Sequence, residues 1–209
     1  MEKRIEKISV ASLKSLKPAL ANWQKFMDVD FWDDRNDAPW WYNERALLSL
    51  FAGAVWKYRE GWAFEEFTTD KRKTTKRGKR KKSKGRGDIT FGIGEQGFVA
   101  EAKQCWPILG TRSQGVTEII SKTLRSACRD CSALPSYGYG RLGILFVVPR
   151  IRISRGKQKN ASEKLDMFLS AISSFRTTAS AWMFPIEKRF LKGGDGYLYP
   201  GIVLLLKPL

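Results

Sequence analysis

Histidine is absent from this chain of 209 residues. Its absence excludes Ser-His-Asp and Cys-His catalysis, hydrolases that bind metal through imidazole, and nucleases whose general base is histidine. Any chemistry must therefore use carboxylates, lysines, tyrosines, cysteines or a metal bound through oxygen atoms.

Cysteines and long apolar runs are also scarce. Three cysteines cannot all pair with one another, which suits a reducing compartment and predicts a cytoplasmic protein. No apolar run approaches the roughly 18 residues of a membrane span. The start, MEKRIEKISV, lacks the apolar segment of a signal peptide. We therefore expect no membrane partner.

Acidic residues are few beside the basic ones. The chain has 38 Lys and Arg against 21 Asp and Glu, a net charge of +17. Such an excess predicts a polyanionic partner, nucleic acid before membrane. Eleven basic residues and no acid lie within residues 71–86. Like-charge runs are usually solvated loops, so residues 71–87 are predicted to form a basic loop that binds phosphates. The candidate phosphate ligands are Lys71, Arg72, Lys73, Lys76, Arg77, Lys79, Arg80, Lys81, Lys82, Lys84 and Arg86.

The order of expected elements predicts an α/β fold, a mixed central sheet flanked by helices. Residues 1–38 read as an N-terminal extension, helical over 12–27 and then acidic. Asp37 and Pro39 read as the start of a helix that runs to about residue 60, with Glu44 on its apolar stripe. The core, residues 39–150, then continues with strands at 62–69 and on both sides of residues 94–97, a helix at 116–134 and a strand at 141–149. An α-β-β extension, residues 151–209, follows with a helix at 160–175 and strands at 180–186 and 197–207.

The segment GRGDITFGIGEQGFVAEAKQCW, residues 85–106, reads as a β-hairpin with charged residues inside apolar strands. A turn centred on residues 95 and 96 predicts pairs whose numbers sum to 191. Asp88 then opposes Lys103, and Glu101 lies diagonal to Asp88. Strand alternation places these three side chains on one face, opposite an apolar face that includes Ile89 and Ala102.

Two carboxylates at this separation suit Mg²⁺ or Mn²⁺, which prefer oxygen ligands and retain water. Lys103 could orient the attacking water or stabilise charge on a phosphate. Residues 101–103 are the only Asp/Glu-x-Lys triplet in the chain. The alternative is a hairpin with one solvated charged face.

These residues resemble the PD-(D/E)xK, restriction-endonuclease-like nuclease superfamily. The resemblance rests on Asp88, on Glu101-Ala102-Lys103, and on the αβββαβ order of residues 39–150; Gly87 stands where the motif name has proline. It implies that Asp88, Glu101 and the Ala102 carbonyl bind metal, that Lys103 is catalytic, and that Glu44 holds a second metal or a water. Polar residues on or before the second core helix contact phosphate in some relatives, which would be Lys122 and Gln114 here.

The sequence therefore predicts a Mg²⁺- or Mn²⁺-dependent nuclease that hydrolyses DNA, with RNA left open. Double-strand cutters of this type often use two active sites, so a homodimer is compatible with this interpretation. The alternative is a basic nucleic-acid-binding protein without activity: an inactive nuclease-like fold, or an assembly factor of a phage or ribonucleoprotein.

Overall fold

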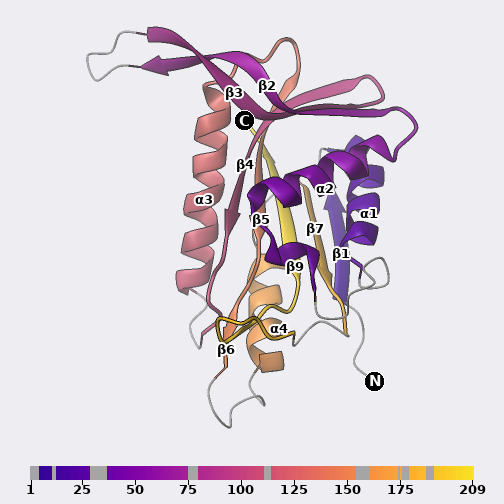
Figure 1. The fold of residues 1–209 in the computed structure, drawn as a ribbon, viewed down its shortest axis with the longest axis vertical. Helices are drawn as coiled ribbons and strands as arrows, with labels where there is room; N and C mark the ends of the chain where they lie inside the picture. The colour runs from indigo at the N-terminus through magenta and orange to yellow at the C-terminus, as the bar shows by residue number, and fades with distance from the viewer. Residues whose placement is uncertain are drawn as a thin grey trace.

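The computed structural model describes residues 5–10, 13–28, 37–74, 80–110, 114–153, 161–173, 175, 179–186 and 191–209. In this part of the chain, one large mixed sheet is flanked by helices, which confirms the predicted α/β class (Figure 1). The elements are β1 (Ile5–Val10), η1 (Lys14–Leu16), α1 (Lys17–Phe26), η3 (Pro39–Trp41), α2 (Glu44–Trp56), β2 (Gly61–Thr74), β3 (Arg80–Ile93), β4 (Gln96–Cys105), α3 (Gln114–Ser132), β5 (Gly140–Val147), β6 (Ile151–Arg152), α4 (Ala161–Ser173), β7 (Ala179–Phe184), β8 (Tyr197–Leu198) and β9 (Ile202–Pro208).

The strand order in the main sheet is β1-β7-β9-β5-β4-β3-β2. Strands β4 and β5 are parallel, and the other neighbours are antiparallel. Helix α3 makes the crossover that parallel neighbours require. The order from α2 to β5 is the expected helix, three strands, helix and strand. Strands from all three predicted segments, 1–38, 39–150 and 151–209, join this one sheet.

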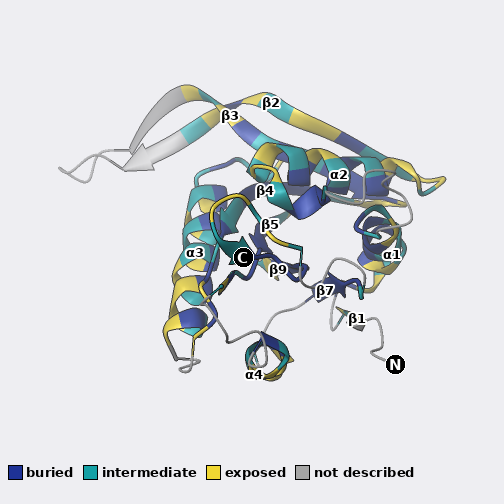
Figure 2. Ribbon diagram, turned by 60° about the horizontal axis from the view of Figure 1, so that its bottom comes forward, coloured by how far each residue is buried: buried dark blue, intermediate teal, exposed yellow. Residues whose placement is uncertain are grey.

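Helices cover both faces of the sheet (Figure 2). In β5, Leu142, Ile144 and Phe146 pack in the cluster that includes α1 and α2. Leu145 and Val147 pack in the other cluster, with α3 and α4. A strand buried on both faces must be apolar at consecutive positions, which explains the nearly uniform run at 141–149.

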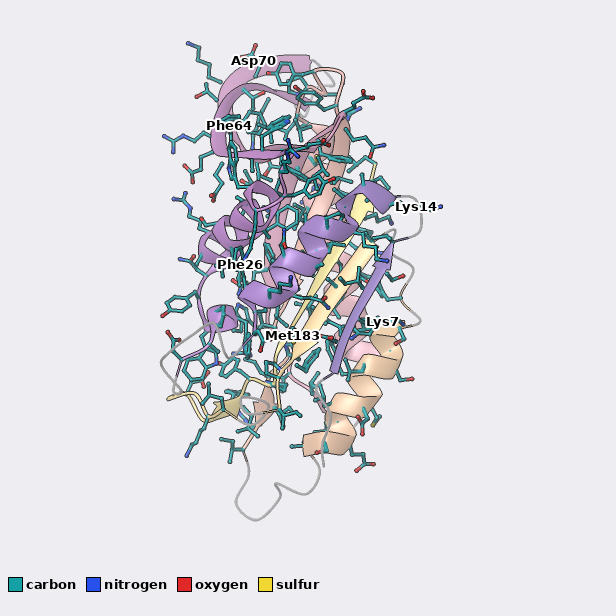
Figure 3. The ribbon with its side chains drawn as sticks, turned by 90° about the vertical axis from the view of Figure 1, so that its right-hand side faces the viewer. Lys7, Lys14, Phe26, Phe64, Asp70 and Met183 are labelled. Carbon is teal, nitrogen blue, oxygen red and sulfur yellow. The ribbon has the colours of Figure 1, made fainter. Side chains whose placement is uncertain are left out.

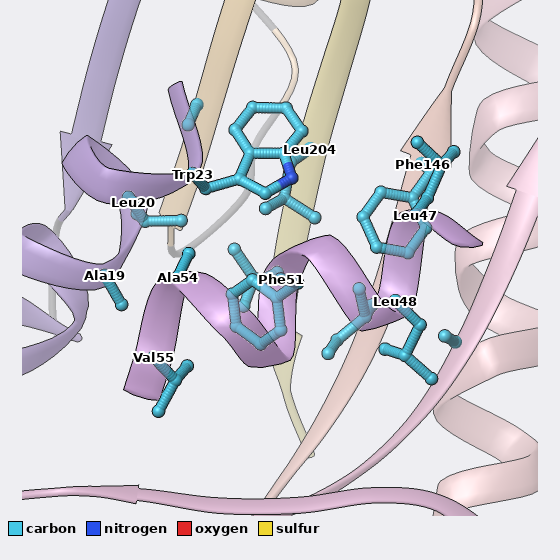
Figure 4. Close-up of a cluster of buried hydrophobic side chains, with 14 of the residues drawn as sticks. Ala19, Leu20, Trp23, Leu47, Leu48, Phe51, Ala54, Val55, Phe146 and Leu204 are labelled. Atoms are coloured by element: carbon cyan, nitrogen blue, oxygen red, sulfur yellow. The ribbon is translucent and has the colours of Figure 1, made fainter. Parts of the chain in front are cut away.

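The larger core lies under α1 and α2 (Figure 4). Trp23 of α1 and Phe51 of α2 are fully buried, and they belong to one apolar cluster with Phe146 and Leu204 of the sheet. Helix α2 is therefore fixed against the sheet along its length, which places its first residue, Glu44, beside β4.

The start of this helix differs from the prediction. Pro39 opens the short helix η3, Tyr42 is extended, and α2 begins after Asn43. The Asn43 side chain accepts a hydrogen bond of 3.1 Å from the Ala46 N–H and is the actual N-cap. Asp37 instead accepts a bond from the Tyr42 hydroxyl. Helix α2 thus starts six residues later than expected, with Glu44 in its first turn.

The predicted basic loop at 71–87 is largely β-structure. Strands β2 and β3 pair without interruption from Phe67↔Gly87 to Thr74↔Arg80, and only residues 75–79 between them lie outside the described residues. Charge repulsion predicted a loop, but the backbone ladder between two strands of 14 residues outweighs it. The hairpin crosses one end of the molecule and extends past α3 (Figures 1 and 2). Asp70 marks its outer part in Figure 3.

Strand β1 was missed by the sequence interpretation. It lies at the sheet edge and pairs with β7 over six residues, from Ile5↔Phe184 to Val10↔Ala179. Among the described residues, no helix combines the length and apolar character needed to cross a membrane.

Candidate active site

The β3–β4 hairpin has a different register from the predicted one. The pairs run from Ile93↔Gln96 to Ile89↔Ala100, so partner numbers sum to 189 rather than 191. The turn is Gly94-Glu95, because Gly94 has φ +57° and glycine adopts that conformation readily. A shift of two residues preserves the faces. Glu101 and Lys103 therefore still share a face of β4, whereas Asp88 lies beyond the last β3–β4 pair, and its predicted position opposite Lys103 is wrong.

Strand β3 leaves β4 after the Ile89↔Ala100 pair, and this opens one edge of β4. Two carboxylates replace the missing ladder. Asp88 Oδ2 accepts a hydrogen bond of 2.8 Å from the Ala102 N–H. Glu44, from α2, accepts one from the Gln104 N–H. The N–H and C=O of a strand residue point to the same neighbour, so the Ala102 carbonyl also faces this open edge.

Glu101 is the most deeply buried acid of the group, with a side chain 4% exposed. Its Oε1 lies 2.8 Å from the Lys71 Nζ, and its carboxyl group also hydrogen-bonds the Asp88 carboxyl. Burial raises the pKa of Glu101 to about 7; Lys71 opposes the rise and Asp88 adds to it. The two acids therefore crowd one another in a site that disfavours two negative charges.

Glu44 belongs to the same electrostatic cluster. Burial raises its pKa, Lys103 lowers it, and Asp88 raises it. The four candidate side chains predicted from the sequence, Glu44, Asp88, Glu101 and Lys103, are thus brought together at the open edge of β4. They come from α2, β3 and β4, and α2 reaches the site because its apolar face is packed on the sheet.

Lys103 has a partner that the sequence interpretation missed. Its Nζ lies 3.6 Å from the Asp130 Oδ2 on α3, and its side chain is 31% exposed. Asp130 lies in the last turns of the predicted helix at 116–134, on the side that packs against β4. Nothing in the sequence links it to Lys103, because the pairing depends on how α3 crosses β4.

Lys71 is the second missed member. It was predicted as a phosphate ligand in a loop, whereas the structure places its ammonium on Glu101. In a flat β-ribbon, Phe67 would share a face with Ala63 and Ile89. Ala63 and Ile89 pack toward α2, but Phe67 packs with Val99 on the α3 side. Between them, Glu66 has φ +50° opposite Asp88. The ribbon therefore turns at Glu66 and brings Lys71 to the site.

The motif Gly-Arg-Gly-Asp has a steric reason at its second glycine. A Cβ at Gly87 would lie 2.4 Å from the Phe67 ring. The Phe67 ring packs on Gly87, the residue that precedes Asp88. Only glycine leaves room for the ring at this position. The position where the PD-(D/E)xK name has proline is therefore fixed here by an aromatic ring on the neighbouring strand.

Cysteine chemistry does not fit this site. Burial raises the pKa of Cys105 to about 12 and that of Cys131 to about 11, so both thiols stay protonated at neutral pH. Cys131 lies close to β4, where its thiol donates to the Val99 carbonyl. A protonated, buried thiol is a poor nucleophile and a poor metal ligand.

The remaining candidates lie outside the cluster. Arg86 pairs with Glu66 at 2.7 Å, and Lys84 is exposed on the hairpin. Lys122 lines a shallow groove with Arg129 and Lys207, and none of the candidate carboxylates lines that groove. Gln114 begins α3, but its side chain lies outside the described part of the structure. The same holds for the basic side chains between residues 72 and 82, and residues 76, 77 and 79 are not described at all.

The residues present fit a hard divalent cation. Among the described residues, no group of three or more acidic or cysteine side chains is arranged to hold a metal ion alone. Mg²⁺, however, commonly uses one or two carboxylates, and completes its shell with water and substrate phosphate. The Asp88 carboxyl raises the pKa of the buried Glu101 carboxyl, so a cation between them would relieve their repulsion.

Comparisons with known proteins add no assignment: no family model, no curated protein and no solved structure matches this chain. The resemblance to the PD-(D/E)xK superfamily therefore rests on the motif and on the order of elements, and it stays a prediction.

Proposed function

We propose that this chain is a Mg²⁺- or Mn²⁺-dependent nuclease that hydrolyses DNA phosphodiester bonds, with a core like that of the PD-(D/E)xK superfamily. One observation carries the proposal: the Asp88 carboxyl lies beside the buried Glu101 carboxyl at the open edge of β4, with Lys103 and Glu44 in electrostatic reach. Structural salt bridges need one acid for each base. A buried acid whose pKa is raised, with a second acid beside it, is typical of a functional site.

The residues take separate roles in this proposal. Asp88 and Glu101 would hold the metal ion, with the Ala102 carbonyl beside them. The bound ion would supply a Lewis acid and lower the pKa of a water molecule. Lys103 presents an ammonium group that stabilises negative charge developing on the phosphate. Glu44, held by the Gln104 N–H, would orient a water or a second ion.

The β2–β3 hairpin gives the proposed substrate a binding surface. It carries eleven Lys and Arg within residues 71–86, and the first of them, Lys71, reaches the carboxyl pair. Contacts from lysine and arginine to phosphates supply affinity without reading sequence. The hairpin would therefore hold the backbone of DNA close to the reacting bond.

The alternative is a nucleic-acid-binding protein without activity. The observation that favours it is the ion pair of Lys71 with Glu101, which partly neutralises the carboxyl pair without any metal. In that case the basic hairpin would bind DNA or RNA and the acids would serve only to anchor it.

A cleavage assay tests the proposal. Supercoiled plasmid and labelled single strands are incubated with Mg²⁺, Mn²⁺ or EDTA. We expect metal-dependent cleavage, and Asp88→Asn, Glu101→Gln and Lys103→Met should each reduce its rate by about 10² or more, because each removes a charge at the reacting centre. Affinity for DNA should remain within a few fold.

The matched control is Glu118→Gln, an exposed acid on α3 outside the cluster, which should cleave like the original chain. Cleavage retained in two of the three site variants would refute the assignment. DNA binding with no cleavage under any metal condition would favour the alternative without activity.

A further inference from the structure

Lys71 lies where the basic hairpin meets the carboxyl pair. Beyond it, Arg72 pairs with Lys82 and Lys73 pairs with Lys81 across the two strands. Like charges at directly opposed positions of an antiparallel pair are destabilising. A polyanion bound along the outer hairpin would therefore relieve repulsion. Lys71 is the cation of the hairpin whose described contact reaches the site, at Glu101.

The contact of Lys71 with Glu101 is supported by the packing of the Lys71 side chain. The Lys71 stem lies over Gly85, where a Cβ would be 3.0 Å from both Cγ and Cδ. Its Nζ then meets Glu101 at 2.8 Å, with the Lys71 side chain 24% exposed. The turn that aims Lys71 is at Glu66, which has a positive φ and forms ion pairs with Arg45 at 2.8 Å and Arg86 at 2.7 Å. A non-glycine residue in this conformation stores strain, which persists only where the surroundings impose it.

We propose that Lys71 couples the two binding sites: its ammonium exchanges between Glu101 and a phosphate of nucleic acid bound along the hairpin, so that nucleic acid and divalent ion each strengthen the binding of the other. This inference rests on the proposed function. Without nucleic acid, the ammonium competes with the ion for one carboxylate. With nucleic acid, the phosphate takes the ammonium and Glu101 is released to the metal. Lys71 is therefore a positioning residue.

Coupling of this kind must be reciprocal. If phosphate releases Glu101 for the metal, the metal must by the same factor favour the state in which Lys71 binds phosphate. Couplings between sites commonly change affinity by about 5- to 150-fold. Both directions can be measured as binding constants, without any cleavage.

The first measurement uses Mn²⁺ alone and isothermal titration calorimetry. Lys71→Met should bind Mn²⁺ about tenfold more tightly than the original chain, because the competing cation is gone. Gly85→Ala, which crowds the Lys71 stem, should shift the affinity in the same direction by less. Lys25→Met removes an exposed charge on α1, outside the hairpin, and should leave the affinity within about twofold.

The second measurement uses a short phosphorothioate DNA duplex and fluorescence anisotropy at constant ionic strength, with Mn²⁺ or with EDTA. In the original chain and in Lys25→Met, Mn²⁺ should tighten DNA binding at least fivefold. In Lys71→Met this enhancement should disappear. Unchanged enhancement in Lys71→Met would overturn the coupling and leave the nuclease proposal intact. No Mn²⁺ binding by any variant, with or without DNA, would overturn the nuclease proposal as well.

Discussion

Glu101 is a carboxyl group in surroundings that disfavour its charge. Burial and Asp88 raise its pKa from 4.5 to about 7, although Lys71 opposes the rise. The folded state therefore binds a proton more tightly than the unfolded state. The stability that this proton contributes is fully present below pH 4.5 and is lost as pH rises through about 7.

This sign leads to a prediction on stability. In EDTA, the free energy of unfolding measured by urea denaturation should fall by on the order of 1–3 kcal/mol between pH 5 and pH 7.5. Glu101→Gln carries no titrating group at this position, so its stability should fall less over the same range. The absence of histidine makes the window unusually clean, since no imidazole titrates within it.

Glu44 provides a second test of the same effect. Its pKa is also raised by burial, so Glu44→Gln should flatten the profile in the same direction. Glu118→Gln should leave the profile unchanged. Parallel profiles for the original chain and Glu101→Gln would show that the Glu101 carboxyl ionises as in the unfolded chain. A divalent ion bound at the pair should instead stabilise the protein more as pH rises, because binding requires both carboxylates ionised.

At the scale of elements, the β2–β3 hairpin separates two kinds of residue. Its inner part, through Phe67 and Lys71, is fixed to the body of the protein. Its outer part carries opposed cationic pairs. The inner part would thus set the geometry of the site, and the outer part would set the affinity for phosphates.

Neutralising the outer part should weaken binding without changing sequence preference. Four changes to glutamine, at Arg72, Lys73, Lys81 and Lys82, should reduce affinity for unrelated duplexes about equally. The slope of log affinity against log salt should become shallower by up to roughly 4, at about 0.9 for each phosphate that the variant no longer neutralises. The control replaces four basic residues of other elements: Lys14, Lys17, Lys25 and Lys164.

Selective loss of one sequence in the quadruple variant would identify the hairpin as a reader of bases, contrary to this prediction. Anisotropy titrations of three unrelated duplexes at four salt concentrations separate the two results.

The elements themselves were largely predictable where patterns are local. Apolar spacing predicted α2, the helices expected at 116–134 and 160–175 correspond to α3 and α4, and the apolar run predicted β5. The register of β3 and β4 was wrong by two residues because it depends on which glycine of Gly-Ile-Gly-Glu-Gln-Gly takes positive φ. The strand residues 71–74 and 80–86 were missed because charge predicts solvation, while the ladder depends on a partner strand.

At the scale of the whole molecule, the sheet joins the two ends of the described chain. Strand β1 pairs with β7, all six residues of which are buried. Without β1, the edge of β7 would be open to other molecules. A chain that starts at residue 13 should lose about 3 kcal/mol or more of stability, at roughly 0.5–1.5 kcal/mol for each ladder hydrogen bond.

Thermal unfolding and light scattering test this expectation. Ile8→Pro, which removes one N–H from β1, should give a smaller shift in the same direction. A truncated chain that is monomeric and as stable as the full one would show that β1 contributes nothing to the edge. The role of β1 could not be predicted from the sequence, because this strand of six residues is short and half-polar and lies far along the chain from β7.

The candidate site was predictable only in part, for a related reason. Asp88, Glu101 and Lys103 were predicted from strand alternation within one hairpin, and Glu44 from its position on an apolar helix face. Asp130 and Lys71 come from elements whose placement depends on tertiary packing. The interpretation of residue 71 as part of a loop was wrong because Lys71 lies in β2, and its stem needs Gly85 and the turn at Glu66 to reach Glu101.

The early departure of β3 from β4 also bears on how this protein can be engineered. Variants selected only for heat resistance should tend to extend the β3–β4 ladder past Ile89, since each new backbone bond adds stability. Closing that gap would displace Asp88 from the Ala102 N–H and Glu44 from Gln104. Higher thermal stability and an intact candidate site therefore place opposite requirements on the short part of β3 next to Ile89.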